Sequence, residues 1–580
     1  MPDFSNNPNQ PRKPKKDLTM EVRLIIAFVL MGIVLFVSPL FFKTPPTPPR
    51  PQTPPTANPA PNPEEPKKPD APKPDAPQQA ATTDHEFIGP QAPPSTITVE
   101  TRLYVVKLSN AGGVVTSWVL KDFKDSEGKR LELVNLTALE AKKPAPFSIM
   151  YQDGKDAEQL NSALFTPAKT EDNDGTTVSF MYAAGRTQCT KTFHFRKNSY
   201  LSSVTSEVRQ NDLGVPHLLE WRGGFGDFKV LNRQAVEQSV YFDLANNKLL
   251  LHGAGSPADE RGLYSFAGLQ DTFFAVLMLP PPELNSAIQV RSFKDDVVLQ
   301  KDAAAEPYVG VAVGGGEKNE FSVFVGPKNV DILKNVDPKH NRLSQLIDWG
   351  WFWFLAKPLF ATLHWLNDKV LHSYGWSIVV VTIVINILLL PLRFKSMKSA
   401  KKMQALAPQI KTINAKYKDV GMRDPRKAEQ NKEVMELYKK NGVNPMGGCL
   451  PMLVQLPILY AFYKVLNVTV ELRGAPWLWV ADLSQPEQLP IHVLPIVMII
   501  TQFMMQKMTP SPSADASQAK MMRFMPLLFG FFFYNMSSGL VLYWLTGNLV
   551  GIAQQWLMNK RTPAVEIIPA PKLGPGKKNR

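Results

Sequence analysis

The sequence predicts an α-helical polytopic membrane protein with six spans and one large all-β sandwich domain. Two observations support this fold class. Uncharged apolar stretches occur near the N-terminus and again through the last third of the chain, and short β-rich runs separated by turn signals fill residues 95–337. The hydrophobic content of 44% and the mean hydropathy of -0.15 resemble those of a soluble protein because these unlike parts are averaged.

The composition of the 580 residues excludes several classes of protein. With 34 glycines there is no Gly-X-Y repeat, and the two cysteines, Cys189 and Cys449, cannot form a disulfide-stapled scaffold or a CxxC pair. Motifs for phosphate loops, dinucleotide binding, metalloproteases and serine hydrolases are absent, and the eight histidines are not spaced as metal ligands. We therefore expect no enzyme activity, no catalytic residue, no metal and no cofactor.

The first predicted span lies at residues 24–42, after a basic segment at residues 1–23. Its 19 residues carry no charge and reach about 28 Å as a helix, which is enough to cross a bilayer. The positive charges before it predict a cytoplasmic N-terminus. A cleaved signal peptide is the alternative, but the run is long for one and its exit offers no small-x-small cleavage site.

A proline-rich linker and a β domain follow this anchor. Residues 43–94 hold 18 of the 52 prolines and are expected to form an extended tether. In residues 95–337, turn signals such as Gly112-Gly113 separate the β-rich runs, which predicts one large sandwich outside the cytoplasmic membrane. Cys189 lies within it and is expected to be a buried small hydrophobe rather than a reactive thiol.

The character of the chain changes again after the β domain. Residues 342–375 are aromatic-rich with scattered charges, which is typical of an amphipathic helix lying in the membrane interface. The second, third and fourth spans are predicted at 376–392, 449–466 and 489–506, with an outer loop at 467–488. None of these spans contains an acidic residue, which argues against a carboxylate proton relay or an aspartyl protease site in the membrane.

The last apolar stretch, residues 524–556, has 33 uncharged residues. As one helix it would reach about 50 Å, against a hydrocarbon core of about 30 Å. A turn-type sequence, residues 535–539, lies near its middle, and both flanks, 507–523 and 557–580, are basic. We therefore expect a fifth and a sixth span as a short hairpin with both chain termini in the cytoplasm, and a bilayer that is locally thinned by the mismatch in length.

The cytoplasmic loop at residues 393–441 carries 14 Lys or Arg against 5 Asp or Glu. Apolar residues in an a/d pattern predict one arm of a helical hairpin, with Pro408 expected to kink that helix or delay its start, and Asp424 is expected to cap the second arm. The a/d residues are Met403, Leu406, Ile410, Ile413 and Tyr417. The charge either only fixes the topology or docks the hairpin onto an acidic partner such as ribosomal RNA or a targeting factor.

Uncharged polar side chains recur within the predicted spans. For each one alone, a hydrogen bond between helices is sufficient explanation. Together they exceed what packing needs and suggest a shared hydrophilic concavity. These residues are Thr382, Asn386, Gln455, Thr501, Gln502, Ser537, Ser538, Thr546 and Asn548.

Four stretches carry a resemblance to a known family: GGCLPMLVQLP, VELRGAPWLWVADLS, LPIVMIITQFMMQKMTP and FMPLLFGFFFYNMSSGLVLYWLTGNLVGIAQQ. They resemble the membrane core of the YidC/Oxa/Albino insertase family, in its Gram-negative type. The resemblance implies an inner-membrane protein with a five-span insertase core, a periplasmic β-supersandwich and a hydrophilic groove open to the cytoplasm. It also implies an insertase and chaperone for newly made membrane proteins, which acts alone or with the Sec translocon and its accessory subunits.

The resemblance also assigns site residues and partners. The groove positions match Thr382, Asn386, Gln455, Ser538 and Trp544. The basic tail and the basic hairpin would recruit the ribosome or the signal-recognition-particle pathway, and would bind anionic lipids. The hairpin residues are Lys398, Lys401, Lys402, Lys411 and Lys416.

One position departs from the family, because an arginine is usual where this chain has Asn386. Arg393 lies seven residues later, on nearly the same helical face and about 10 Å nearer the cytoplasm. We therefore hypothesise that Arg393 supplies the positive charge at the groove mouth, and that Asn386 offers hydrogen bonds only.

Two other functions are compatible with parts of the sequence. A secondary transporter would also have polar residues in its spans, but it should show inverted repeats and more spans. A membrane anchor that displays a periplasmic β domain needs only one span, and it leaves the polar core and the basic hairpin unexplained.

Overall fold

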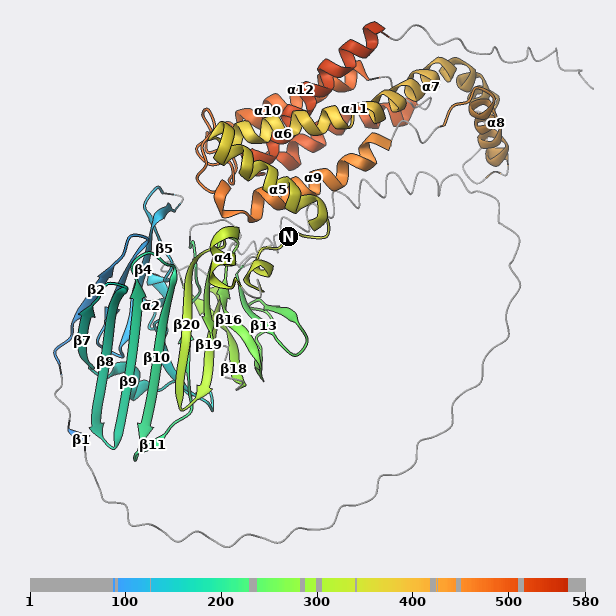
Figure 1. The fold of residues 1–580 in the computed structure, drawn as a ribbon. Helices are drawn as coiled ribbons and strands as arrows, with labels where there is room; N and C mark the ends of the chain where they lie inside the picture. The colour runs from blue at the N-terminus through green and yellow to red at the C-terminus, as the bar shows by residue number, and fades with distance from the viewer. Residues whose placement is uncertain are drawn as a thin grey trace, which may run out of the picture. The chain divides into compact units, whose positions relative to one another are not determined.

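The computed structural model describes residues 87–88, 92–125, 127–228, 237–281, 287–298, 305–338, 342–417, 424, 426–444, 450–509 and 516–561 (Figure 1). The predicted anchor span 24–42 lies outside these residues, as do residues 1–23, most of the linker 43–94, Cys449 and the tail after residue 561. The described residues fall into two compact units, the first with Tyr417 and residues 424–433, and the second with residues 87–416 and those from Val434 onward. The second unit contains the β domain and nearly all of the described helices.

The β domain consists of three antiparallel sheets. The largest has 11 strands in the order β1-β8-β9-β10-β20-β17-β16-β13-β14, with β11 paired to β10 and β7 paired to β8. Its strands are β1 (Phe87–Ile88), β7 (Thr166–Glu171), β8 (Gly175–Gly185), β9 (Thr187–Arg196), β10 (Leu201–Gln210), β11 (Leu213–Gly214), β13 (Gln238–Asp243), β14 (Lys248–His252), β16 (Tyr264–Gln270), β17 (Phe274–Leu279) and β20 (Lys318–Pro327).

Two smaller sheets complete the domain. A five-stranded sheet has the order β15-β18-β19-β12-β6 and a four-stranded sheet the order β2-β3-β4-β5. Their strands are β2 (Thr96–Glu100), β3 (Tyr104–Ser109), β4 (Val114–Lys124), β5 (Arg130–Glu132), β6 (Ser148–Tyr151), β12 (His217–Trp221), β15 (Asp259–Gly262), β18 (Ile288–Val297) and β19 (Glu306–Gly316). Two short helices, α2 (Leu136–Glu140) and α3 (Glu158–Ser162), lie in the connections.

Aromatic side chains join the sheets face to face. Trp118 of the four-stranded sheet packs on Phe195 of the largest sheet, with ring centroids 5.8 Å apart, and both are at most 1% exposed. Phe147, just before β6, contacts Phe193 of the largest sheet at 5.5 Å and Trp221 of the five-stranded sheet at 5.8 Å. Burial of such rings is the main gain from stacking sheets. The predicted all-β sandwich is thus confirmed.

Cys189 is the third residue of β9 and is fully buried. Alternate residues of this strand are buried, as expected when one face of a strand packs on the core. Burial raises the pKa of the Cys189 thiol to about 11. The thiolate is therefore scarce at neutral pH, which agrees with a packing role rather than a reactive one.

Helices dominate the chain after the β domain, coloured yellow to red in Figure 1. They are α4 (Val330–Val336), α5 (Trp353–Leu366), α6 (Tyr374–Leu388), α7 (Leu390–Lys416), α8 (Arg426–Lys440), α9 (Leu450–Val468), α10 (Val493–Met508), α11 (Ala516–Phe533) and α12 (Ser538–Arg561). Helix α12 packs against α6 and α10, and α5 packs against α9.

Helix α5 lies within the stretch expected to form an interfacial helix. A π-helical turn at Asn367–Leu371 follows it, and His372 then takes a left-handed conformation with φ of 48°. In the part of the chain that the structure describes, no single helix combines the length and the apolar character needed to cross a bilayer. Residues 353–371 and α6 meet those criteria only as a pair, which is bent by 119°.

The boundaries of several helices differ from the predicted spans. Helix α6 ends at Leu388, and α7 starts at Leu390 with Pro391 in its first turn, where a proline costs no hydrogen bond. Helices α11 and α12 have 18 and 24 residues, and both extend beyond the uncharged stretch into basic flanks. The break between them, at residues 534–537, coincides with the turn-type sequence. The six membrane crossings stay predictions.

The basic loop contains two helices, α7 and α8. Met403, Leu406 and Ile410 of α7 are buried, and Val434 and Leu437 of α8 pack against them. The a/d pattern therefore identifies the apolar seam, although Pro408 lies inside the continuous helix α7 and does not delay its start. At the other end, an Asp424 carboxylate oxygen accepts a hydrogen bond from the Arg426 amide at 2.9 Å, as expected for a cap.

Buried polar contacts connect the β domain to the loop between α9 and α10. Arg473 forms an ion pair with Asp227, and the two side chains are 7% and 2% exposed. The Arg473 guanidinium also donates to the Lys124 carbonyl at 3.0 Å and lies over the rings of Phe273 and Phe274. Breaking an ion pair this deeply buried leaves the remaining charge buried without a partner, which is costly, so the pair holds this loop against the β domain.

Two further contacts lie beside this pair. The Asn329 amide donates to Glu471 at 2.8 Å, and the Lys464 ammonium donates to Asp348 at 2.6 Å. Lys328 is buried and donates to the Gln270 side chain at 3.2 Å, and burial lowers the pKa of Lys328 to about 8. Polar groups therefore contribute to this attachment.

Candidate functional site

Thr382 and Asn386 occupy one buried face of α6, one turn apart. The Thr382 hydroxyl donates to the Ile378 carbonyl at 2.6 Å, and the Asn386 amide nitrogen donates to the Thr382 carbonyl at 2.7 Å. Asn386 is 1% exposed, and its side-chain oxygen has no hydrogen-bond partner among the described residues. Since a buried acceptor without a partner is costly, this oxygen is available to a donor that enters the helical core.

Arg393 reaches the same region from the first turn of α7. One of its guanidinium nitrogens donates to the Gln554 side-chain oxygen at 3.0 Å, and the Gln554 amide nitrogen donates to the Asn386 carbonyl at 3.2 Å. The three residues therefore form a hydrogen-bonded chain across α6, α7 and α12. Over the described ranges, Arg393 pairs with no carboxylate, so its positive charge is not neutralised by an ion pair.

Gln455 contributes to a second polar contact, between α9 and α12. Its amide nitrogen donates to the Tyr543 hydroxyl. Tyr543 is buried and stacks on Phe462 of α9, with ring centroids 4.0 Å apart. The Tyr543 ring thus presents an apolar surface to α9 and places its hydroxyl beside the Gln455 amide.

Trp544 joins three helices by its ring and its nitrogen. The indole nitrogen donates to Gln502 of α10 at 3.1 Å. The ring stacks on Phe529 of α11 at 5.5 Å and contacts Phe533 at 5.2 Å. One end of this side chain is polar and the rest is apolar, an arrangement suited to a boundary between a polar region and lipid.

Ser538 stands apart from the other predicted site residues. It is the first residue of α12, and both its backbone nitrogen and its hydroxyl donate to the Gln485 carbonyl, at 2.8 Å and 2.9 Å. These bonds fix the start of α12 to the loop before α10. Farther along α12, the Asn548 amide donates to the Met498 carbonyl at 3.2 Å and to the Thr501 hydroxyl at 3.3 Å, which joins α12 to α10.

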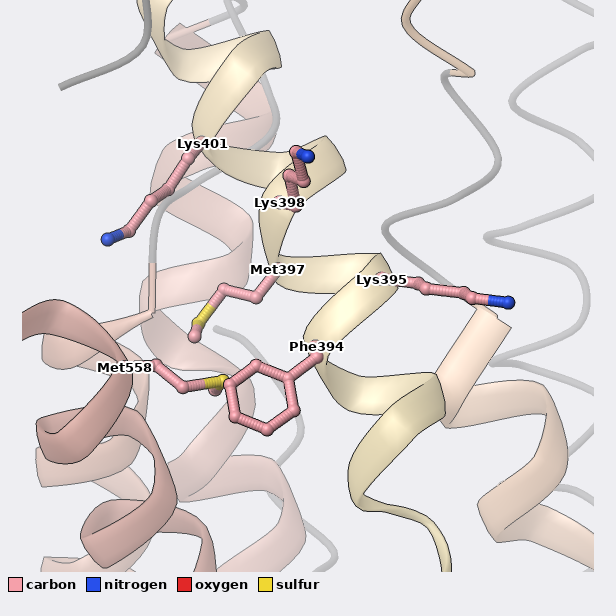
Figure 2. A pocket seen from close by; sticks show the side chains of 6 residues that line it. All are labelled: Phe394, Lys395, Met397, Lys398, Lys401 and Met558. Carbon is pink, nitrogen blue, oxygen red and sulfur yellow. The ribbon is translucent and has the colours of Figure 1, made fainter. Parts of the chain in front are cut away.

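The predicted recruitment residues lie along α7. Lys398, Lys411 and Lys416 are exposed, and Lys401 and Lys402 are partly exposed. Phe394, Met397 and Met558 line a cavity of about 220 Å³ between α7 and α12, together with Lys395, Lys398 and Lys401. In Figure 2 the ends of Lys395 and Lys401 point to opposite sides, so the ammonium groups do not converge on one anion site.

Two residues of the polar chains were not expected from the sequence, Gln554 and Tyr543. With Gly547 and Gly551 they are spaced 4, 4 and 3 residues apart, which places all four on one face of α12. That spacing is the signal that could have identified this face.

Within the ranges described above, no group of three or more His, Cys, Asp or Glu side chains could hold a metal ion.

Comparisons with known proteins cover both parts of the chain. A family model described as "60Kd inner membrane protein" matches residues 365–565, and a model of the YidC periplasmic domain matches residues 96–362. A membrane protein insertase YidC of Citrifermentans bemidjiense is 35% identical over 480 residues, which are 80% of this chain and 85% of that protein. The insertase YidC of Geotalea uraniireducens is 33% identical over 562 residues, 94% of this chain and 100% of that protein.

Other matches cover less of the chain or are less similar. The insertase YidC of Campylobacter jejuni is 44% identical over 268 residues, which are 46% of this chain and 48% of that protein. A crystal structure of an active YidC insertase with its first transmembrane domain resolved aligns with 81% of this chain and 93% of that chain, at 20% identity and a TM-score of 0.35.

Proposed function

Because the chain belongs to the family of YidC membrane protein insertases, we propose that it inserts newly made membrane proteins along the polar faces of α6, α9 and α12. The family assignment makes it an inner-membrane insertase with a periplasmic domain. It does not favour the alternatives, a secondary transporter or an anchor that displays the β domain. The six-span topology with both termini in the cytoplasm is part of the proposal.

The proposed mechanism follows from the cost of moving polar groups through lipid. Moving one unpaired backbone amide from water into hydrocarbon costs a free energy of about 2 to 7 kcal/mol. A client's hydrophilic leading segment therefore needs partners on its way. The Asn386 oxygen supplies an open acceptor, and the Gln455 amide and the Trp544 nitrogen supply donors by exchanging their present bonds to Tyr543 and Gln502, while the client's apolar segment passes into lipid.

A single observation supports this path most strongly: Arg393, Gln554 and Asn386 form a hydrogen-bonded chain across three helices, and Arg393 has no carboxylate partner among the described residues. A cation left unpaired in a partly buried region attracts negative charge more strongly than the same cation in water. We propose that Arg393 draws acidic residues of the client's leading segment toward the polar faces, in the role that the family assigns to an arginine at the position of Asn386.

Site-specific photo-crosslinking tests the path. With a photoreactive residue at position 386, 455 or 544, a stalled nascent membrane protein is expected to crosslink at each position, because the client passes the polar faces. The matched control carries the same photoreactive residue at position 251, where Leu251 is 44% exposed on the β domain. Crosslinks at 251 as strong as those at the three test positions would contradict the path.

The exposed lysines of α7 are proposed to recruit the ribosome or the signal-recognition-particle pathway, and anionic lipids. Basic side chains gain affinity for nucleic acid by releasing counterions from phosphates, whatever the base sequence. The Sec translocon with its accessory subunits is a further proposed partner. The five lysines are tested as a set.

We expect glutamine at Lys398, Lys401, Lys402, Lys411 and Lys416 to weaken co-sedimentation with ribosome–nascent-chain complexes. Each lost phosphate contact should reduce the slope of log affinity against log salt by roughly 0.7 to 0.9. A variant with glutamine at Lys129, Lys155 and Lys294, which are exposed on the β domain, is the control. An unchanged slope in the five-residue variant would leave these lysines with a role in topology only.

A further inference from the structure

We propose that Gln554 is a positioning residue, which holds the Arg393 guanidinium against the end of α6 so that its charge acts on clients with acidic leading segments. This inference rests on the proposed function of Arg393. It concerns a residue that neither the family resemblance nor the polar pattern of the spans singles out, and it specifies which clients depend on it.

Both the oxygen and the nitrogen of the Gln554 side-chain amide form hydrogen bonds. Gln554 is 9% exposed, its oxygen accepts from Arg393 at 3.0 Å and its nitrogen donates to the Asn386 carbonyl at 3.2 Å. Only a group with both an acceptor and a donor can make these two bonds at once. The amide therefore fixes its own orientation on α6 and, through it, the position of the guanidinium.

The end of α6 provides a suitable electrostatic environment for this cation. Asn386 lies among the last four residues of α6, whose carbonyls lack partners within an ideal helix. The carboxyl end of α6 carries a partial negative charge that favours a nearby cation, and it opposes the partial positive charge at the start of α7, where Arg393 lies. A guanidinium stays protonated in a protein without a carboxylate partner, so the charge of Arg393 remains available to a client.

Helix α12 leaves room for the arginine at this place. A β-carbon at Gly551 would lie 3.4 Å from a guanidinium nitrogen of Arg393 and 2.7 Å from the Met505 sulfur. One turn earlier, a β-carbon at Gly547 would have nothing within 4 Å. A β-carbon at position 551 would therefore displace the Met505 side chain and lie in van der Waals contact with the guanidinium, while position 547 borders open space.

The adjacent residue, Gln555, is a natural control. It is also buried, at 6% exposure, and its amide nitrogen donates to the Met508 carbonyl at 3.1 Å and to Asn559 at 3.2 Å. None of these bonds involves a charged group. Gln554 and Gln555 are thus chemically identical and similarly buried, but only Gln554 contacts Arg393.

The test compares two clients that differ only in whether the leading segment carries acidic residues or their amides. The full-length protein is assayed in a depletion strain, with its level checked by immunoblot, and the readout is the insertion ratio of the acidic client to the neutral client. Gln554→Met should lower this ratio about tenfold, because it removes a hydrogen bond to a charged group. Gln554→Glu should lower it as well, since a carboxylate would neutralise Arg393.

Two further variants show whether the effect comes from the position of the charge. Gln555→Met should leave the ratio as in wild type. Asn386→Arg combined with Gln554→Met should restore the ratio, because an arginine on α6 supplies the charge without the amide.

The outcomes separate this inference from the proposed function. A wild-type ratio in Gln554→Met, an equal loss in Gln555→Met, or no rescue by Asn386→Arg overturns the role of Gln554. If Arg393→Ala itself leaves the insertion ratio unchanged, the proposed function of Arg393 is wrong, whatever the result for Gln554.

Discussion

Replacing Arg393 with alanine is expected to reduce the insertion of clients with acidic leading segments on the order of tenfold, which corresponds to a loss of about 1.4 kcal/mol. The reason is the unpaired state of this cation. Its guanidinium bonds to the Gln554 amide and to no carboxylate within the described residues, so no internal ion pair competes with a client. Neutral clients should insert nearly as well as with wild type, because Asn386 and Gln455 remain in place.

Two further variants separate the effect of the charge of Arg393 from the effect of the shape of its side chain. Arg393→Lys keeps the charge but loses the planar group, and it should retain part of the activity. Lys395→Ala removes an exposed cation two residues away, whose end points away from Lys401 in Figure 2, and it should insert both clients normally. Insertion is measured by protease protection of the leading segment in a depletion strain. An Arg393→Ala variant that inserts acidic clients as well as wild type would exclude this role.

Replacing Asp227 with alanine should produce the largest loss of stability, about 3 to 5 kcal/mol. This change leaves Arg473 buried without its carboxylate partner, and a lone buried charge costs far more than an exposed one. The loop between α9 and α10 should loosen from the β domain. A lower midpoint of thermal unfolding of the purified protein in detergent would show the loss, and faster amide exchange in residues 470–484 would locate it.

Matched variants identify the buried charge as the cause. Asp296→Ala removes a carboxylate of the same domain that pairs with Lys294 at 3.2 Å, but about half of each side chain is exposed, so the midpoint should hardly change. Asp227→Leu combined with Arg473→Met removes both charges and should recover most of the loss. If Asp227→Ala unfolds at the wild-type temperature, the ion pair does not hold the loop.

Local patterns in the sequence predicted most of the helical part. The a/d spacing identified Met403, Leu406 and Ile410 as the buried seam of α7, and the turn-type residues 535–539 marked the break between α11 and α12. These features depend on neighbours within one or two turns of helix, which the sequence shows directly. Pro408 does not delay the start of α7, because a proline inside a long helix can be accommodated when packing compensates the lost hydrogen bond, and the kink expected at Pro408 stays a prediction.

The sequence by itself determined the fold class, the approximate positions of the helices and the polar residues of the helical core. Only the tertiary structure decided which of these residues meet. Arg393 and Gln554 are 161 residues apart in the chain, and Asp227 and Arg473 are 246 residues apart, so no local period relates the partners. A hydrogen bond or an ion pair requires two groups within about 3 Å, and such proximity follows from the packing of whole helices and sheets.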